Sequence, residues 1–178
     1  MEDFIKFSKI PRLSRDCVIT EKIDGTNAQI FIGGNGEFLT GSRNRWIVPG
    51  DDNAGFAKWA MEHKEELLTL GPGRHYGEWW GLGIQRRYGL DEKRFSLFNT
   101  GRWNKDNTPD CCHVVPVLYS GIFTTDMTNY EIERLKEHGS FAAPGFMDPE
   151  GIVIYHEAAR TMFKKTIKND EKPKGAVK

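Results

Sequence analysis

Short apolar stretches rich in β-branched and aromatic residues recur along the chain, and most of them end at a glycine-containing turn. This pattern is typical of β-strands. It predicts strands over residues 17–22, 28–32, 37–40, 75–79, 95–98, 114–120, 151–155 and 161–167. The glycine-rich turn at 33–36 indicates that the second and third of these strands form a hairpin.

Two segments follow the helical period instead. Large apolar residues recur at helical spacing from Phe56 to Leu70, and the segment 71–73, Gly-Pro-Gly, ends that helix. Thr128 and Glu131 have the spacing of a capping box, and the helix that they open ends at Gly139. Strands outnumber helices, and most connections are short. The pattern therefore predicts an α+β fold with mostly antiparallel sheets.

The composition narrows the class of protein. A chain of 178 residues predicts one domain, and 38% hydrophobic residues argue against a disordered chain. The sequence has no apolar run of about 18 residues, the length of a membrane span. The N-terminus has no apolar core of a secretory signal. Three cysteines, two of them adjacent, suit neither a metal knuckle nor a disulfide framework, which favours a reducing cytoplasm.

The charge is balanced overall but unevenly distributed. The formal net charge is zero, which argues against a general nucleic-acid coat protein. Residues 74–105 nevertheless hold 7 basic and 3 acidic side chains, and residues 160–178 hold 7 and 2. Residues 106–159 hold only 2 basic and 9 acidic side chains. The basic segments could be ordinary solvated faces or could bind a polyanion locally.

One short segment carries candidate chemistry. Lys22 ends a predicted strand, Asp24 follows two residues later, and Gly25 begins a tight turn. A lysine becomes a nucleophile when burial or nearby cations lower its pKa. Gly25 would let the backbone approach a phosphate closely. Alone, this spacing is weak evidence, since a lysine and an aspartate are common on a hairpin turn.

The segment 22–25, Lys-Ile-Asp-Gly, resembles the first motif of the covalent nucleotidyltransferases, the superfamily of ATP-dependent nucleic-acid ligases and mRNA-capping enzymes. Five later segments resemble its other motifs in the same order, over 41–44, 76–78, 95–98, 150–153 and 162–166. The resemblance covers residues 18–168. Glu21 before the lysine and Asn27 after the glycine make the sequence most similar to the RNA ligase 2-type family.

The resemblance implies an α+β fold: a nucleotidyltransferase domain built on antiparallel sheets with flanking helices. This ligase catalytic domain would be ATP-grasp-like and would have no OB-fold. This domain would span residues 1–168, and a flexible basic tail would follow over 169–178. The nucleotide would lie in the cleft between the sheets. The residues implied at the nucleotide are Glu21, Lys22, Asp24, Gly25, Asn27, Arg43, Glu78, Phe98, Glu150, Lys164 and Lys165.

The resemblance also implies roles. Lys22 would attack ATP and carry AMP covalently. Arg43 would contact the ribose or a nucleic-acid phosphate, with Arg45 as an alternative in the same role. Glu78 would contact the ribose. Phe98 would stack on the adenine, although an aromatic residue at a strand position can also belong to the core.

The last two motifs concern the metal and the phosphates. Glu150 would hold Mg²⁺ (or Mn²⁺), and Lys164 and Lys165 would hold the α-phosphate. The family usually has two lysines separated by one residue, which places both on one face of a strand. Here the lysines are adjacent and should point to opposite faces. Lys164 shares its face with Thr166 and Lys168 and is the better candidate.

The motifs together predict an ATP-dependent polynucleotide ligase that joins 5′-phosphate and 3′-hydroxyl ends, of RNA in preference to DNA. A DNA ligase, a capping-type enzyme that uses GTP, and a non-catalytic protein that binds nucleic-acid ends are the alternatives. About ten residues follow Lys168, so no appended domain is expected, and a partner protein could supply one. We expect a cytoplasmic protein, in the host cytoplasm if the source is a virus.

Overall fold

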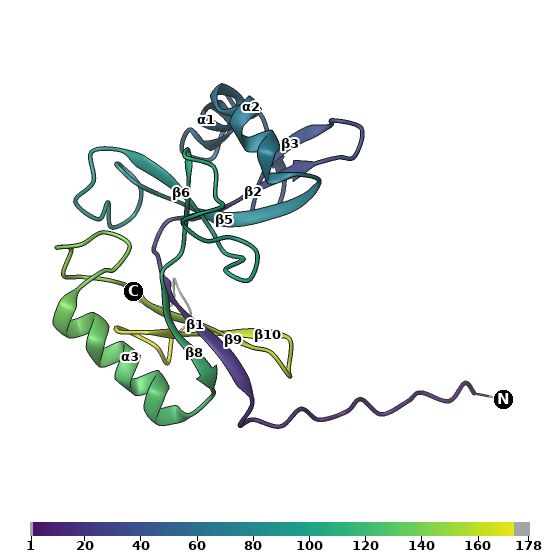
Figure 1. The fold of residues 1–178 in the computed structure, drawn as a ribbon, viewed down its shortest axis with the longest axis vertical. Coiled ribbons are helices and arrows are strands. Elements are labelled where there is room, and N and C mark those ends of the chain that lie inside the picture. The colour runs from purple at the N-terminus through teal and green to yellow at the C-terminus, as the bar shows by residue number, and fades with distance from the viewer. Residues whose placement is uncertain (1, 173–178) are drawn as a thin grey trace.

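The computed structural model describes residues 2–172, in which strands form two sheets and helices lie against each of them (Figure 1). The strands are β1 (Asp16–Lys22), β2 (Thr26–Ile32), β3 (Phe38–Ser42), β4 (Trp46–Ile47), β5 (Gly73–Gly81), β6 (Lys93–Leu97), β7 (Cys112–Val114), β8 (Val117–Ile122), β9 (Gly151–His156) and β10 (Thr161–Thr166). The helices are α1 (Phe56–Glu62), α2 (Lys64–Leu67), a 3-10 turn η1 (Leu68–Leu70) and α3 (Thr125–His138). This confirms the predicted α+β class with mostly antiparallel sheets.

The smaller sheet has the order β10-β9-β1-β8, with every neighbouring pair antiparallel. Alternate residues of β1 and β9 point to one face, where they pack against the apolar side of α3. The buried residues of this cluster are Cys17, Ile19, Ile132, Leu135, Ile152 and Ile154. A short turn over residues 157–160 joins β9 to β10 in an antiparallel hairpin.

The larger sheet has the order β4-β3-β2-β5-β6-β7, and only the pair β6 and β7 is parallel. Helices α1 and α2 cover one face of this sheet (Figure 1). The core there is aromatic: the ring of Phe56 on α1 lies 5.5 Å from that of Trp79 on β5 and 5.0 Å from that of Phe95 on β6. All three side chains are buried.

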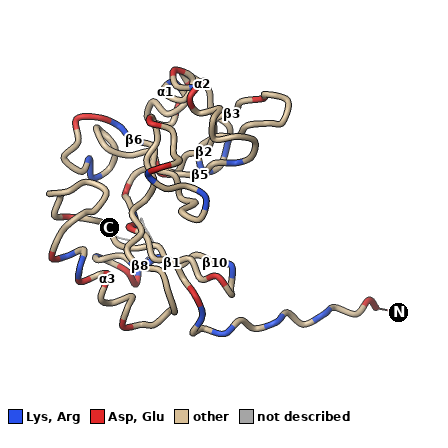
Figure 2. The backbone as a smooth tube through the Cα atoms, in the orientation of Figure 1, with Lys and Arg blue, Asp and Glu red and all other residues tan. Residues whose placement is uncertain are grey.

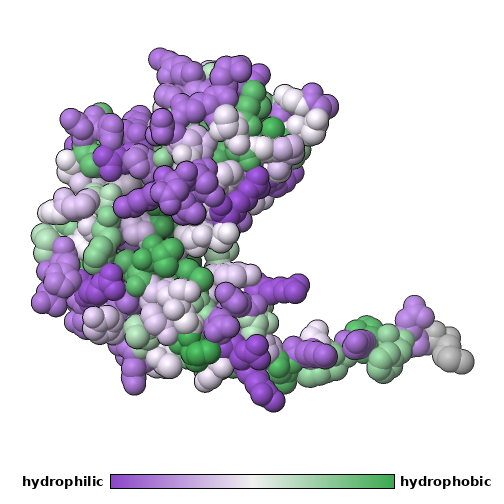
Figure 3. Space-filling model, in the orientation of Figure 1, coloured by the Kyte–Doolittle hydropathy of each residue, from purple (hydrophilic) through white to green (hydrophobic). Residues whose placement is uncertain are grey.

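Residues 23–25 pass from the smaller sheet to the larger one, because β1 and β2 belong to different sheets. A third buried cluster fills the junction, and its members are Ile23, Trp80, Tyr88, Val115 and Ala143. The segment that resembles the first motif thus lies where the two sheets meet. Figure 3 shows the surface hollowed between the part that holds the larger sheet and the part that holds the smaller one.

Three predicted elements differ from the structure. The helix predicted from Phe56 to Leu70 is interrupted at His63, whose ring nitrogen bonds the carbonyl of Trp59 at 2.9 Å as the backbone leaves the helical conformation. The predicted strand 114–120 is two strands in different sheets. They are separated at Pro116, which has no N–H to continue a ladder.

The capping box proposed at Thr128 is also wrong. Thr124 is the N-cap of α3, and its hydroxyl accepts the backbone N–H of Met127 at 3.1 Å. Thr128 lies one turn inside the helix and donates to the carbonyl of Thr124 at 3.0 Å. The predicted end of the helix at Gly139 is confirmed.

The two ends of the described chain differ in character. Residues 2–13 run as an extended, exposed arm that includes several Lys and Arg residues (Figures 1 and 2). At the other end, Asp170 accepts the N–H of Thr166 at 2.8 Å and so closes a turn. Most of the predicted tail, 173–178, lies outside the described residues. Within residues 2–172, none of the helices combines the length and the apolar character needed to cross a bilayer.

Candidate active site

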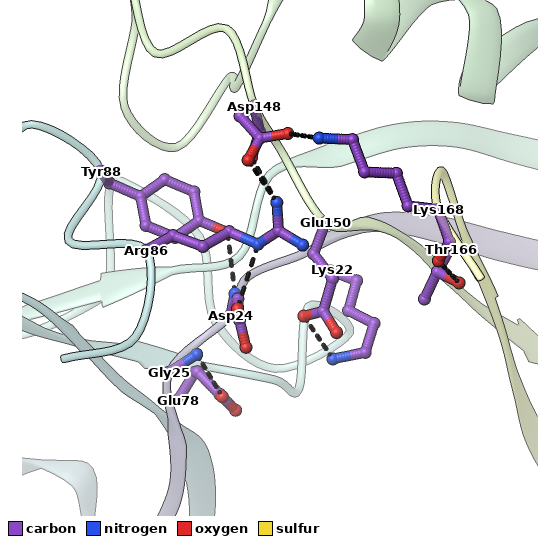
Figure 4. A network of polar contacts seen from close by, with 10 residues as sticks. All are labelled: Lys22, Asp24, Gly25, Glu78, Arg86, Tyr88, Asp148, Glu150, Thr166 and Lys168. Carbon is purple, nitrogen blue, oxygen red and sulfur yellow. Dashed lines mark hydrogen bonds and ion pairs between the residues drawn. The ribbon is translucent and has the colours of Figure 1, made fainter. Parts of the chain in front are cut away.

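Lys22 and Glu150 form the centre of the site. Lys22 ends β1 and lies directly opposite Gly151, the first residue of β9, so Glu150 precedes that strand beside the lysine. Lys22 Nζ is 2.8 Å from Glu150 Oε2 (Figure 4). The lysine side chain is 21% exposed and the glutamate side chain 9% exposed. The amine is therefore held in one place and is still reachable from solvent.

Glu78 is a second buried carboxylate at the same junction. It lies on β5 opposite Asn27 on β2, and Asn27 Nδ2 donates to Glu78 Oε2 at 3.0 Å. The backbone N–H of Gly25 donates to Glu78 Oε1 at 2.9 Å. Burial raises the pKa of Glu78 to about 7, although the charge of Lys22 and these two hydrogen bonds oppose the rise. Near neutral pH this carboxyl is therefore close to its midpoint of ionisation.

Gly25 is required by a close approach between two protein segments. A Cβ atom at this position would collide with the carbonyl oxygen of Trp79 and lie 2.7 Å from Trp80 Cβ. The glycine therefore lets the segment between β1 and β2 lie against β5, where its N–H reaches Glu78. The sequence had suggested a different reason, an approach to a phosphate.

The two lysines of β10 lie on opposite faces of the smaller sheet, as predicted. Lys164 lies in the same row across the strands as Thr20, and Lys165 lies in the same row as Glu21. Residues in one row share a face, and Lys22 is two residues from Thr20. Lys164 is therefore on the face of Lys22, whereas Lys165 points to the opposite face.

Glu21 does not join the group around Lys22. Its buried carboxylate accepts hydrogen bonds from Ser140 Oγ at 2.5 Å, from the N–H of Phe141 at 2.8 Å and from the N–H of Ala142 at 2.9 Å. Burial raises its pKa, and these bonds oppose the rise. The sequence placed this residue at the nucleotide because it precedes the lysine, but strand alternation turns its side chain toward the loop after α3.

Arg43 and Phe98 belong to connections of the larger sheet, whereas Lys22 ends a strand of the smaller one. Arg43 is exposed in the turn between β3 and β4. Its alternative, Arg45, is bound to Asp51, with Nη2 2.7 Å from Oδ1. Phe98 follows β6 and is 38% exposed, so it is not a core residue.

The family model for RNA ligase matches residues 15–168 of the sequence. The chain belongs to the RNA ligase family. No curated protein matches it in a sequence search.

Solved structures of a Naegleria gruberi RNA ligase resemble this member of the RNA ligase family in fold. A mutant with ATP and Mn has a TM-score of 0.62 at 18% identity, covering 88% of this chain and 51% of that one. A mutant with AMP and Mn has a TM-score of 0.62 at 17% identity, covering 85% and 49%. An apo mutant has a TM-score of 0.60 at 17% identity, covering 86% and 50%. The chain spans about half the length of these structures.

The sequence did not single out a charged network beside the site. Arg86, in the loop between β5 and β6, has Nε 3.0 Å from Asp24 Oδ2 and Nη1 2.7 Å from Asp148 Oδ2 (Figure 4). Lys168 Nζ is 2.7 Å from Asp148 Oδ1, and this bond and Arg86 lower the pKa of Asp148. The hydroxyl of Tyr88 accepts the N–H of Asp24 at 2.8 Å. The network links the larger sheet to the end of the smaller one.

The loop that supplies Arg86 has an unusual backbone. Gln85, Arg87 and Tyr88 have φ values of 45°, 60° and 52°, in the left-handed region that non-glycine residues seldom adopt. Such strain persists where surrounding contacts fix it. Two adjacent arginines and a tyrosine, residues 86–88, follow the matched segment 76–78 after seven residues and were the available sequence signal.

The described residues around Lys22 supply one carboxylate for a divalent ion and not a complete set of ligands. In the part of the chain that the structure describes, no group of three or more His, Cys, Asp or Glu side chains could hold a metal. Mg²⁺ usually keeps several waters and binds one or two carboxylates together with substrate phosphates. Glu150, a single carboxylate beside Lys22, fits an ion of that kind.

Proposed function

We propose that this protein is an ATP-dependent RNA ligase that acts through a covalent lysine–AMP intermediate. One observation carries the proposal. In a chain of the RNA ligase family, Lys22 is held 2.8 Å from Glu150, with Lys164 on the same face of the sheet. The Naegleria gruberi structures with ATP or AMP and Mn support a nucleotide and a divalent ion as cofactors.

In the first step, Lys22 Nζ is oriented by the hydrogen bond that Glu150 accepts, and it loses one proton to solvent before it attacks and a second as the phosphoramidate forms. The neutral amine attacks the α-phosphorus of ATP. A phosphorus–nitrogen bond forms as the bond to pyrophosphate breaks. Negative charge grows on the phosphate oxygens, and fixed cations nearby stabilise it. Lys164, on the same face of the sheet as Lys22, is the proposed cation.

In the second step, a 5′-phosphate oxygen of the RNA attacks the AMP phosphorus, and the phosphorus–nitrogen bond breaks. In the third step, a 3′-hydroxyl attacks the activated phosphate and AMP leaves. Glu150 would hold the divalent ion, which supplies charge neutralisation to the phosphates. Glu78 and Phe98 on the larger sheet are the proposed ribose and adenine contacts.

The test uses the whole protein with ATP labelled at the α-phosphate and Mg²⁺, followed by a denaturing gel. We expect covalent label on the wild-type protein and none on Lys22→Ala. Lys58→Ala is the matched control, because Lys58 is 72% exposed on α1 and away from the site. An unlabelled wild-type protein, or equal labelling of Lys22→Ala, contradicts the proposal.

RNA as the substrate is supported by the family match and by Asn27 after Gly25, a residue typical of the RNA ligase 2-type family. Joining of RNA ends should exceed joining of DNA ends of the same sequence and structure, and labelling by ATP should exceed labelling by GTP. A partner that supplies a further domain, and a cytoplasmic location, are proposals as well. Cys17, Cys111 and Cys112 are free thiols, which favours a reducing compartment.

A further inference from the structure

The larger sheet has a face that no helix of the described chain covers. Helices α1 and α2 pack on one side, against the rows that contain Ala28 and Ile30. The intervening residues of β2 point to the opposite side, together with their partners on β5. Two rows cross this open face: Gln29 lies opposite Tyr76, and Phe31 lies opposite Arg74.

Arg74 is held between two aromatic rings on this face. Its guanidinium carbon lies 5.0 Å from the ring centroid of Phe31 and 5.3 Å from that of Trp46 on β4. Arg74 Nη1 donates to Gln29 Oε1 at 3.3 Å. Among residues 2–172, no carboxylate lies within ion-pair distance of Arg74. Its charge is therefore available to an anion.

Two aromatic residues on this face are exposed to solvent. Trp46 is 44% exposed and Tyr76 52% exposed, whereas the aromatic residues on the covered face, such as Trp79, are buried. Arg43, in the turn between β3 and β4, is a second exposed cation at this end of the sheet. We call Phe31, Trp46, Arg74 and Tyr76 the aromatic–arginine surface.

This surface is continuous with the proposed active site. Tyr76 is two residues before Glu78 on β5, so the two side chains share a face about 7 Å apart along the strand. Tyr76 also accepts, through its carbonyl, the N–H of Phe98 at 2.9 Å. From β5 to β4 the surface crosses three strand spacings, roughly 14 Å.

The chemistry of the surface matches a single-stranded nucleic acid. Aromatic rings offer stacking faces for bases, and an arginine held by aromatic rings offers charge to a phosphate. A duplex would keep its bases stacked on one another and would present only phosphates. We infer that the aromatic–arginine surface binds unpaired bases of the RNA strand next to the end that is joined. This inference rests on the proposed function, since RNA is its ligand.

The test measures binding of a fluorescent, 5′-phosphorylated, single-stranded RNA oligonucleotide by anisotropy at one fixed salt concentration, without ATP. We expect Trp46→Ala and Tyr76→Ala each to weaken binding about fivefold to a hundredfold, the usual effect of losing one base-stacking ring. Trp46→Phe should recover most of the affinity. Tyr130→Ala is the matched control, because Tyr130 is a 58% exposed aromatic residue on α3, outside this surface. Thermal melting of each variant verifies that it is folded.

Two results would overturn the inference. One is an unchanged RNA affinity in both folded alanine variants. The other is an equal loss of affinity for a blunt RNA duplex, because that would assign the surface to phosphates rather than bases. Labelling of the wild-type protein with ATP tests the proposed function without RNA, and the RNA titration tests the surface without ATP. Failure of either experiment is therefore distinguishable from failure of the other.

Discussion

The buried carboxyl of Glu78 should make the free energy of unfolding depend on pH, and Glu78→Gln should abolish this contribution. Burial raises its pKa from 4.5 to about 7, so the folded state binds this proton more tightly than the unfolded state does. Between these two pKa values the folded protein holds more protons on Glu78 than the unfolded protein does. The contribution of Glu78 to the free energy of unfolding therefore falls as the pH rises from 4.5 to 7.

The size of the effect follows from the shift. At about 1.4 kcal/mol for each pKa unit, the carboxyl costs roughly 3 kcal/mol of stability once it is ionised in the folded state. Glu78 is 7% exposed, so solvent screening reduces this value little. Glu78→Gln cannot ionise. The stability of wild type minus that of Glu78→Gln should therefore fall by roughly 3 kcal/mol between pH 4.5 and pH 8.

The assay is urea denaturation of both proteins at several pH values, with a chelator and without ATP. Subtracting the two curves cancels other titrating groups, including Glu21, whose pKa is also raised by burial. Glu62→Gln, which removes an exposed carboxylate from α1, is the control and should give a curve parallel to that of wild type. If the curves of wild type and Glu78→Gln are parallel, the reasoning from burial is wrong.

Three further predictions concern neighbouring residues. Gly25→Ala should destabilise the protein by roughly 1–3 kcal/mol in urea denaturation, because the added methyl group collides with the backbone of β5. Arg86→Ala should lower the free energy of unfolding by about 2–4 kcal/mol because two aspartates lose their shared cation. Arg87→Ala makes the same change of charge at an exposed side chain and should lower it by less than about 0.5 kcal/mol. Lys164→Ala should slow labelling by ATP at least about tenfold, and Lys165→Ala should slow it far less, because only the first lysine shares the face of the nucleophile. Equal rates for the two lysine variants would contradict this assignment.

The strands and the α+β class could be predicted because their signals are local. Alternating apolar residues decide which side of a strand is buried, and the same alternation correctly separated Lys164 from Lys165. The helix starts and breaks were harder. Thr124 and Thr128 are both good caps by type, and only the backbone of the folded chain shows which one leaves the helix. The apolar period continues through His63, so the pattern does not show that the backbone leaves the helical conformation there.

The candidate site was predictable only as a set of residues. The motif order grouped Lys22 with Glu150, 128 positions later, and with Glu78. Which of these residues touch, and which face of a strand each one occupies in the site, depend on the tertiary structure. In the tertiary structure, Glu21 binds the loop after α3 instead of joining the site, and Gly25 is required for packing against β5. Arg86 was missed because its importance comes from two aspartates that the fold brings to it.

The position of Arg86 explains how a site divided between two sheets stays together. Lys22 ends a strand of the smaller sheet and Glu150 directly precedes another, whereas Glu78 lies in the larger sheet. Neither set of contacts alone fixes the distance between the nucleophile and the proposed ribose contact. Arg86 extends from the larger sheet to Asp148, two residues before Glu150 in the loop that leads into β9, and it also binds Asp24 between the sheets. Because it contacts neither Lys22 nor Glu150 directly, its effect on the chemistry should come through positioning, and the strained loop that holds it is the structural cost of that role.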